Sequence, residues 1–297
     1  MIYLVDASVY VFRAYYSALP EFLDQEGQPA HAVYGFARFL GDLIERARPT
    51  YMAVAFDQSL TGSFRNRIYP AYKANREPAP PGLALQFERC FEFCTLAGIA
   101  ALGSPEYEAD DIIGSIAARM RAANVRSTLV SRDKDLAQLV REGDVFWDYA
   151  ARDPLSYSDV KRHYGVAPER FADYLALTGD AVDNIPGIPG IGPKTAAGLM
   201  QEFASLDELY GGLDRVSGLK VRGAARLRAL LLEHREAAYL ARQLTGIVCD
   251  MPLAIETSAL RRQRPDLEGL RRFFDRQTFG PLLRRQAERL AQLPTPS

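Results

Sequence analysis

The sequence predicts an α/β protein in which a mainly parallel central sheet, flanked by helices, is followed by a helical region. Short apolar runs at 1–6 and 51–57 enclose a stretch of helical periodicity at 32–47, as in a βαβ unit. Both runs end in an aspartate. Beyond about residue 153 strand-like runs stop, and helical patterns continue toward the C-terminus. We therefore expect a sheet domain first and a helical region after it.

The composition is that of a globular chain. Its 297 residues are 48% hydrophobic and 25% charged, which is enough for a substantial core in one or two domains. The three cysteines lack partners at metal-ligand spacing and are expected to be buried thiols. A net charge of −1 argues against nucleic-acid binding unless it hides opposed patches. With no basic leader and no apolar run of roughly 20 residues, we expect a cytoplasmic protein without a membrane partner.

Acidic residues follow the predicted strands. In an open α/β sheet, ligands bind beyond the carboxyl ends of the strands, where Asp6 and Asp57 point. Either aspartate alone is as well explained by a turn or cap. A third predicted strand, 127–131, leads to Asp133. Three strands that end in aspartate at one edge indicate a functional site.

The stretch from 108 to 135 adds further acids to the same edge. Glu108, Asp110 and Asp111 fall on the first turn of a predicted helix, and Asp135 follows the strand at 127–131. Carboxylates on a first turn also serve as caps, so this group alone leaves a purely structural role open. The helix itself is indicated by the apolar spacing of Ile112, Ile113, Ile116 and Met120.

Residues 62–82 are basic, aromatic and interrupted by proline. Prolines at 70, 78, 80 and 81 exclude a core strand or a long helix. Cations interleaved with rings are typical of single-strand capture, with charges for phosphates and rings for bases. A solvated surface loop is the alternative, although the position after Asp57 favours a role at the site. The residues concerned are Phe64, Arg65, Arg67, Tyr69, Tyr72, Lys73 and Arg76.

A glycine- and proline-rich hairpin opens the second half. Residues 184–195 predict a tight turn followed by a helix from Lys194, which presents backbone N–H groups to an anion. A hydrophobic strand does not precede it, so a nucleotide-binding loop is excluded. A sequence-independent clamp on a duplex backbone fits better. Asp180 and Asp183 lie just before the turn, whose glycines are Gly187, Gly190 and Gly192.

The C-terminal stretch 261–290 is helical and rich in arginine. Its leucines and phenylalanines give it apolar faces. A packed helical cap with a solvated basic side and a DNA-contacting element are equally consistent with this pattern.

Together the acids predict a metal-dependent chemistry. A bare cluster would repel itself, and oxygen ligands without histidine or cysteine select a hard cation, Mg²⁺ or Mn²⁺. Two such ions about 4 Å apart hydrolyse a phosphodiester by activating water and stabilising the leaving oxygen. The nine acids are Asp6, Asp57, Glu108, Asp110, Asp111, Asp133, Asp135, Asp180 and Asp183.

These motifs, in this order, resemble the 5′ nuclease superfamily. LVDAS, AFD, FRNRIYPAYKANR, YEADD, SRDKDL and TGDAVDNIPGIPGIGPKTA are similar to segments of the 5′→3′ exonuclease domain of bacterial DNA polymerase I and of flap endonucleases, over residues 1–255. The resemblance implies a PIN-like nuclease core, a helical arch and a helix-three-turn-helix, also called helix-hairpin-helix, that binds duplex. Because the sequence ends at Ser297, we expect a stand-alone protein without a polymerase.

The resemblance also implies roles for individual residues. Asp6, Asp57 and Asp110 would hold the first metal, with Glu108 between the two metals and Asp111 close by. Asp133, Asp135 and Asp180 would hold the second, with Asp183 as an outer ligand. Lys73, Arg76 and Asp110 would be catalytic, and a K⁺ ion would sit in the hairpin. DNA would be bound by Arg13, Arg65, Tyr72, Lys73, Arg76, Gly187, Gly190, Ile191, Gly192, Lys194 and Thr195.

The function expected is a structure-specific 5′→3′ exonuclease or flap endonuclease acting on 5′ flaps, nicks or RNA-primer ends and leaving 5′-phosphates. We expect a monomer that meets other replication or repair proteins. The expected domains are a core at 1–170 with an arch at about 62–82, a duplex-binding region at 171–260 and a basic extension at 261–297. A PIN-like ribonuclease and a non-cleaving branched-DNA-binding protein are the alternatives.

Overall fold

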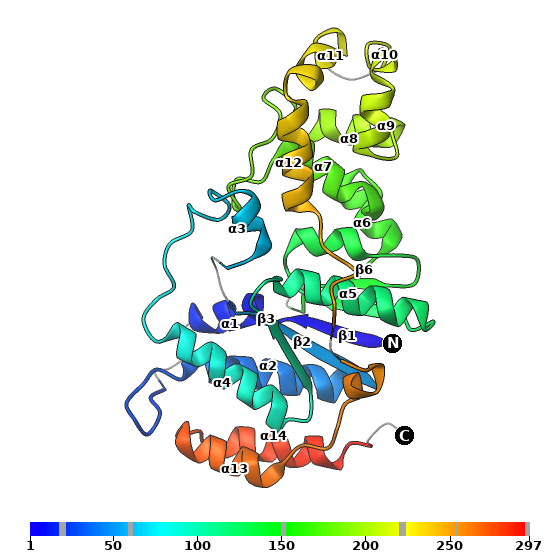
Figure 1. The fold of residues 1–297 in the computed structure, drawn as a ribbon. Helices are drawn as coiled ribbons and strands as arrows, with labels where there is room; N and C mark the ends of the chain where they lie inside the picture. Colours follow the sequence, from blue (N-terminus) through cyan, green and yellow to red (C-terminus); the bar gives the residue numbers. More distant parts are fainter. Residues whose placement is uncertain (18–21, 59–61, 150–152, 220–223, 254, 295–297) are drawn as a thin grey trace. The chain divides into compact units, whose positions relative to one another are not determined.

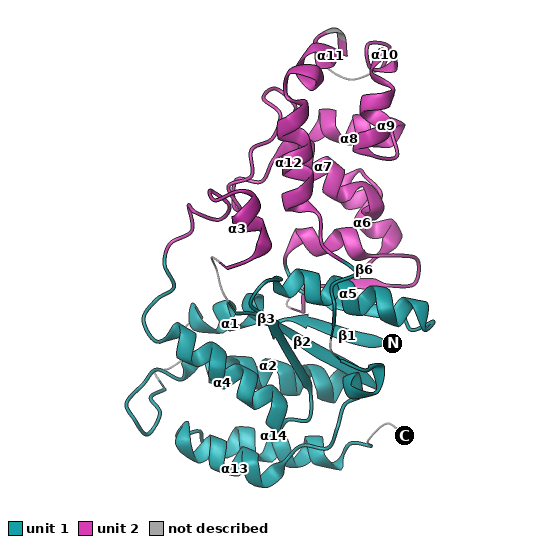
Figure 2. Ribbon diagram, viewed as in Figure 1, with its two compact units in different colours: residues 1–58, 78–132, 249–297 teal, residues 59–77, 133–248 magenta. Residues whose placement is uncertain are grey.

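The computed structural model describes residues 1–17, 22–58, 62–149, 153–219, 224–253 and 255–294. The chain divides into two compact units, each built from separate stretches of sequence (Figure 2). Unit 1 comprises residues 1–58, 78–132 and 249–297, and unit 2 comprises 59–77 and 133–248. These units cut across the predicted domain ranges, because 62–77 clusters with the second half of the chain and 261–297 with the first.

Unit 1 contains the parallel sheet. Its strands lie in the order β3-β2-β1-β4, of which Figure 1 labels the first three, and Asp6 at the end of β1 is in register with Ala55. Buried valine, leucine and alanine side chains on both faces of β1 and β2 explain the continuous apolar runs. The strands are β1 (Ile2–Asp6), β2 (Tyr51–Asp57), β3 (Ala100–Ser104) and β4 (Ser127–Val130).

Helices cover this sheet in layers. Helix α5 packs along all four strands, while the ring of Phe36 of α2 lies at a tilt beside that of Phe56 of β2. Helices α13 and α14 contact α4 and α2, outside the first layer (Figure 1). The helical elements of unit 1 are α1 (Ala7–Tyr15), α2 (His31–Ala47), α4 (Leu83–Leu96), α5 (Ala109–Ala122), η3 (Thr257–Leu260), α13 (Leu267–Arg276) and α14 (Pro281–Gln292).

The C-terminal pair of helices forms a packed cap. Phe273 and Phe274 are buried. Several of the arginines form ion pairs, such as Arg289 Nε with Glu45 Oε1 at 2.6 Å and Arg284 Nη2 with Asp275 Oδ1 at 2.7 Å. The predicted apolar faces of this stretch are therefore packed.

Unit 2 is mainly helical. Helices α7 and α12 pack together, and α8 packs on α7. Only α3 lies in the predicted arch, where turns follow it. The elements are α3 (Phe64–Ile68), η1 (Lys134–Leu139), β5 (Val145–Trp147), β6 (Leu155–Ser156), α6 (Tyr157–Tyr164), η2 (Pro168–Arg170), α7 (Phe171–Thr178), α8 (Pro193–Glu202), α9 (Leu206–Gly211), α10 (Leu213–Val216), α11 (Ala224–Glu233) and α12 (Arg235–Thr245).

The predicted class, a mainly parallel sheet with helices and a C-terminal helical region, is confirmed. The apolar runs at 1–6 and 51–57 are adjacent parallel strands, as a right-handed βαβ unit requires. Within the described ranges, no helix is both long and apolar enough to cross a membrane.

Candidate active site

The acids at the carboxyl edge of the unit 1 sheet are joined through one serine. Asp6 ends β1 and caps α1, accepting a hydrogen bond from Ser8 N at 3.1 Å. Its other oxygen accepts from Ser131 Oγ at 2.9 Å. Ser8 Oγ donates to Asp57 Oδ2 at 2.7 Å. Asp6 and Asp57 therefore lie together beyond the strand ends, and a preorganising hydroxyl network holds them.

The start of α5 is tied to the same edge. Ala109 N donates to Asp57 Oδ1 at 2.8 Å, which aims the first turn of the helix at the strand end. Asp111 is fully buried, and its Oδ2 accepts a hydrogen bond from Glu108 N at 3.0 Å. The capping role that the sequence left open for this turn is therefore real for Asp111. Asp110 lies half-buried on the same turn.

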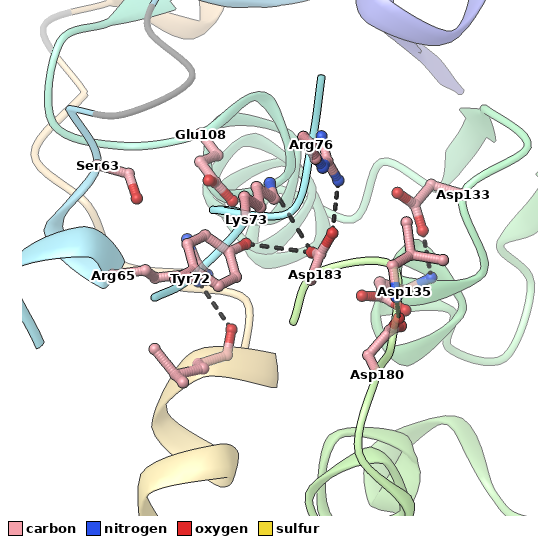
Figure 3. Close-up of polar contacts among 12 residues, drawn as sticks. Ser63, Arg65, Tyr72, Lys73, Arg76, Glu108, Asp133, Asp135, Asp180 and Asp183 are labelled. Carbon is pink, nitrogen blue, oxygen red and sulfur yellow. Dashed lines mark hydrogen bonds and ion pairs between the residues drawn. The ribbon is translucent and has the colours of Figure 1, made fainter. Parts of the chain in front are cut away.

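A second set of acids lies in unit 2 around η1. Asp133 caps η1 and accepts a hydrogen bond from Asp135 N at 2.9 Å. Asp180 is 6% exposed, and its Oδ1 accepts from Val182 N at 2.8 Å. The ammonium of Lys134 pairs with Asp180 Oδ2 and lies 3.5 Å from Asp135 Oδ1. Figure 3 shows Asp133, Asp135 and Asp180 facing one another.

The electrostatics of this set call for a cation. Burial, followed by repulsion from Asp133, raises the pKa of Asp135 to about 7. Asp135 Oδ1 is buried and has no hydrogen-bond partner. Burial alone would lower the pKa of Lys134, but attraction to Asp135 and Asp180 outweighs it, so the pKa of this ammonium is raised. An orphaned carboxylate oxygen among like charges is a donor suited to a hard divalent ion.

Asp183 forms ion pairs with the two basic side chains that were predicted to be catalytic. Arg76 Nη2 lies 2.5 Å from Asp183 Oδ1, and Lys73 Nζ lies 3.8 Å from Asp183 Oδ2. The hydroxyl of Tyr72 donates to the same Oδ2 at 3.3 Å (Figure 3). A single carboxylate therefore gathers three side chains of the 62–82 segment.

Main-chain contacts fasten this segment to the loop before the hairpin. Lys73 N donates to Asp183 O at 3.0 Å, and Lys73 itself adopts a left-handed conformation with φ of 57°. Asn75 Nδ2 donates to Ala181 O at 2.9 Å, and Asn184 Nδ2 donates to Ala71 O at 2.7 Å. The segment is thus ordered against unit 2 by reciprocal hydrogen bonds.

Two predicted DNA contacts need correction. The ring of Tyr72 is 3% exposed and packs in a hydrophobic cluster with Ile185 and Leu244, so it does not present a face to a base. Arg65 is 2% exposed and donates from Nε to Leu244 O at 2.9 Å and from Nη2 to Gly246 O at 2.8 Å. It satisfies carbonyls at the end of α12 instead of meeting phosphate. Both changes have one cause, which is that this part of the segment is packed as core.

The hairpin depends on glycine at two points. A Cβ at Gly187 would lie 2.2 Å from the carbonyl carbon of Thr178, so only glycine allows this close approach. Gly190 has a φ of 86°. Ile191 is 3% exposed, so a DNA contact at this residue would come from its main chain, as predicted for the hairpin.

Other predicted contacts in the chain are accessible. Gly192 has open space around its Cα, and Lys194 is exposed on the first turn of α8. Thr195 is half-buried beside it, and Arg13 is exposed in the last turn of α1.

A preassembled metal centre is not seen among the described residues, where no group of three or more histidine, cysteine, aspartate or glutamate side chains is arranged to hold an ion. The nine predicted acids form two sets, one in each unit. Serine hydroxyls hold the unit 1 strand-end acids, and lysine and arginine hold Asp180 and Asp183.

Three residues of these sets were missed by sequence reasoning. Ser8, Ser131 and Lys134 all contact the acids directly. The pattern of Lys134 between two aspartates, in RDKD, carried a usable signal. Ser131 carried none, because its partner Asp6 is 125 residues away.

Comparison with known proteins gives a consistent result. The family model for the 5′-3′ exonuclease N-terminal resolvase-like domain matches residues 1–165, and that for the 5′-3′ exonuclease C-terminal SAM fold matches 166–268. The 5′-3′ exonuclease of Aquifex aeolicus is 34% identical over 91% of this chain and 89% of its own length. DNA polymerase I of Rhizobium leguminosarum is 38% identical over 97% of this chain, which spans 28% of that relative.

Solved structures share the fold. The T5 5′-exonuclease with bound zinc ions has a TM-score of 0.66 at 18% identity, and the match covers 98% of both chains. The bacteriophage T5 flap endonuclease, in a complex with DNA and metal ions, has a TM-score of 0.62 at 18% identity, over 98% of both chains. At such identities the likeness concerns the fold alone.

Proposed function

Because the chain belongs to the 5′-3′ exonuclease family, we propose that it hydrolyses phosphodiester bonds near the 5′ ends of branched or nicked DNA and leaves 5′-phosphates. The observation that carries the proposal is the buried Oδ1 of Asp135, which accepts no hydrogen bond and lies beside Asp133 and Asp180. A bound cation would stabilise the ionised form of this carboxyl among its acidic neighbours, and divalent cations are the cofactors of phosphodiester hydrolysis by carboxylate clusters.

The proposed ligands follow the two sets of acids. Asp6, Asp57 and Asp110 would hold one ion, with Glu108 as a further ligand and Asp111 supporting the turn. Asp133, Asp135 and Asp180 would hold the second, with Asp183 as an outer ligand. Only oxygen donors are present, which selects Mg²⁺ or Mn²⁺ over zinc. When bound, the ions supply an activated water and charge neutralisation at the scissile phosphate.

The chain's own groups perform the positioning. Lys73 and Arg76 are proposed to exchange Asp183 for a substrate phosphate, because each cation pairs with a carboxylate that an incoming phosphate can replace. Ser8 and Ser131 fix the rotamers of Asp6 and Asp57, so that these carboxylates need no reorganisation when an ion arrives.

The hairpin is proposed to grip the duplex. Gly187, Gly190 and Gly192 let the main chain approach a backbone phosphate, and Lys194 adds a charge at the start of α8. A K⁺ ion held by loop carbonyls would add to this grip. Such contacts carry no sequence preference, so binding should be selected by DNA shape.

At the level of the molecule, we propose a nuclease core at 1–170, a duplex-binding region at 171–260 and a helical extension at 261–297. The proposed partners are DNA with 5′ flaps, nicks or RNA-primer ends, together with other replication or repair proteins. We propose that the protein acts as a monomer on the nucleoid in the cytoplasm.

The test is cleavage of a 5′-labelled flap duplex and a matched single strand with Mg²⁺ or with EDTA. Asp110→Ala should lose at least about a thousandfold in rate while flap binding in Ca²⁺ is kept, and Lys73→Ala should lose about a hundredfold or more. Glu268→Ala, a first-turn acid on α13, and Lys161→Ala, an exposed lysine on α6, are the matched controls.

Each outcome separates the candidate functions. Mg²⁺-dependent cutting of the flap that both site variants lose supports the proposal. Binding of the flap without cutting in any divalent ion would identify a non-cleaving branched-DNA-binding protein. Preferential cutting of an RNA single strand would identify a ribonuclease. If Asp110→Ala and Lys73→Ala cut as fast as the controls, the assigned site is wrong.

A further inference from the structure

The lysine between two of the predicted ligands occupies an unusual position. Lys134 lies in the sequence between Asp133 and Asp135, yet its ammonium reaches across to Asp180, 46 residues away. It is also 3.5 Å from the orphaned Oδ1 of Asp135. One cation therefore contacts two of the three acids assigned to the second ion.

The acids around it cannot all be satisfied by the protein alone. The carboxylate of Asp133 accepts a hydrogen bond from Asp135 N, and one oxygen of Asp180 accepts a hydrogen bond from Val182 N. The second oxygen of Asp180 is satisfied by Lys134, and Asp135 Oδ1 receives no hydrogen bond at all. Two partly buried carboxylates this close are costly unless a positive charge lies between them. In the protein as described, that charge is the ammonium of Lys134.

We propose that Lys134 is a positioning residue, an internal stand-in for the divalent cation. Its ammonium holds Asp135 and Asp180 together while no ion is bound, and its ion pair with Asp180 breaks when a divalent ion binds. This inference rests on the proposed function, since it takes these acids as metal ligands.

The position of the Lys134 side chain allows it to move away from the acids. Its exposed fraction is 42%, against 14% for Asp135 and 5% for Asp180, so the ammonium can swing into solvent while the acids stay in place. Lysine has four rotatable side-chain bonds and a strongly hydrated head group, which lowers the free energy of that movement. The carboxylates of Asp180 and of the neighbouring Asp133, by contrast, each accept a main-chain hydrogen bond.

A competitor of this kind has a measurable signature. Removing the ammonium should strengthen binding of the divalent ion, because the ion no longer has to displace it. It should also destabilise the ion-free protein, because no positive charge then lies between the two carboxylates. A merely structural lysine would produce the second effect without the first. The two readouts together therefore isolate the proposed role.

The experiment titrates Mn²⁺ into the full chain without DNA and follows free Mn²⁺ by electron paramagnetic resonance, with Tm measured in EDTA. Lys134→Met keeps the length of the side chain and removes its charge, and Lys134→Arg keeps the charge. Arg141→Met is the matched control. It removes a cation just after η1, the 3-10 helix that begins at Lys134, and this cation pairs with Glu169 at 3.6 Å.

We expect Lys134→Met to bind Mn²⁺ about 5–20-fold more tightly than the natural chain, which corresponds to removal of one competing charge contact. Its Tm in EDTA should fall, while Lys134→Arg and Arg141→Met should keep the natural affinity. Unchanged or weaker binding by Lys134→Met would overturn the inference and leave the proposed function standing. If the natural chain and Lys134→Met both bind no Mn²⁺, the inference and the proposed metal site are both wrong.

Discussion

Asp183 should act as the latch of the segment that carries Lys73 and Arg76. Its carboxylate contacts both cations and the hydroxyl of Tyr72, and its carbonyl oxygen accepts from Lys73 N. Asp183→Asn keeps the size and the main-chain contact while removing the negative charge. We expect the segment at 69–77 to open more often in this variant, because two of its attachments depend on that charge.

The magnitude follows from the exposure of the partners. Asp183 and Lys73 side chains are 13% and 14% exposed, so their 3.8 Å contact is only partly screened, whereas Arg76 is 36% exposed and contributes less. Hydrogen bonds to a charged group contribute about 1–3 kcal/mol, and those from Arg76 and Tyr72 to Asp183 are of this kind. The opening free energy should fall by that amount, which corresponds to a roughly 5–150-fold rise in opening.

Hydrogen exchange measured by mass spectrometry on peptides covering 69–77 reports this opening directly. The matched control is Asp207→Asn, which changes an aspartate that accepts from a tyrosine hydroxyl, Tyr239, at 2.7 Å elsewhere in unit 2. That variant should leave exchange in 69–77 unchanged. If Asp183→Asn exchanges no faster than Asp207→Asn, the carboxylate does not hold the segment and the latch is refuted.

Three further substitutions test other features. Arg65→Met leaves carbonyls at the end of α12 without donors and should lower the free energy of unfolding by about 2–4 kcal/mol in urea, with an exposed Arg162→Met as control. Gly187→Ala should destabilise by at least about 2 kcal/mol by calorimetry, since its Cβ meets the Thr178 main chain. Because the pKa of Asp135 is raised to about 7, the metal-free protein should lose stability as pH rises from about 4 through about 7. Asp135→Asn should abolish this loss and be about 1–3 kcal/mol more stable than the natural chain at pH 8 in EDTA. Equal stability of the variant and the natural chain would contradict that pKa.

Local pattern predicted the elements that carry the site. The apolar runs that end in Asp6 and Asp57 are neighbouring parallel strands, because continuous burial and a terminal acid are properties of a few consecutive residues. The hairpin was predictable for the same reason, since the close approach at Gly187 and the positive φ at Gly190 each require glycine. The assignment of these acids to metal ions stays a prediction.

Which side chains face solvent was decided only by tertiary structure. Arg65 and Tyr72 belong to a basic, aromatic segment that looks solvated in sequence, yet Arg65 bonds a carbonyl 179 residues away and Tyr72 lies in a core cluster. The pairing of Asp183 with Arg76 spans 107 residues. Composition and spacing describe neighbours along the chain, whereas burial and ion pairing depend on neighbours in space, which only the packed fold brings together.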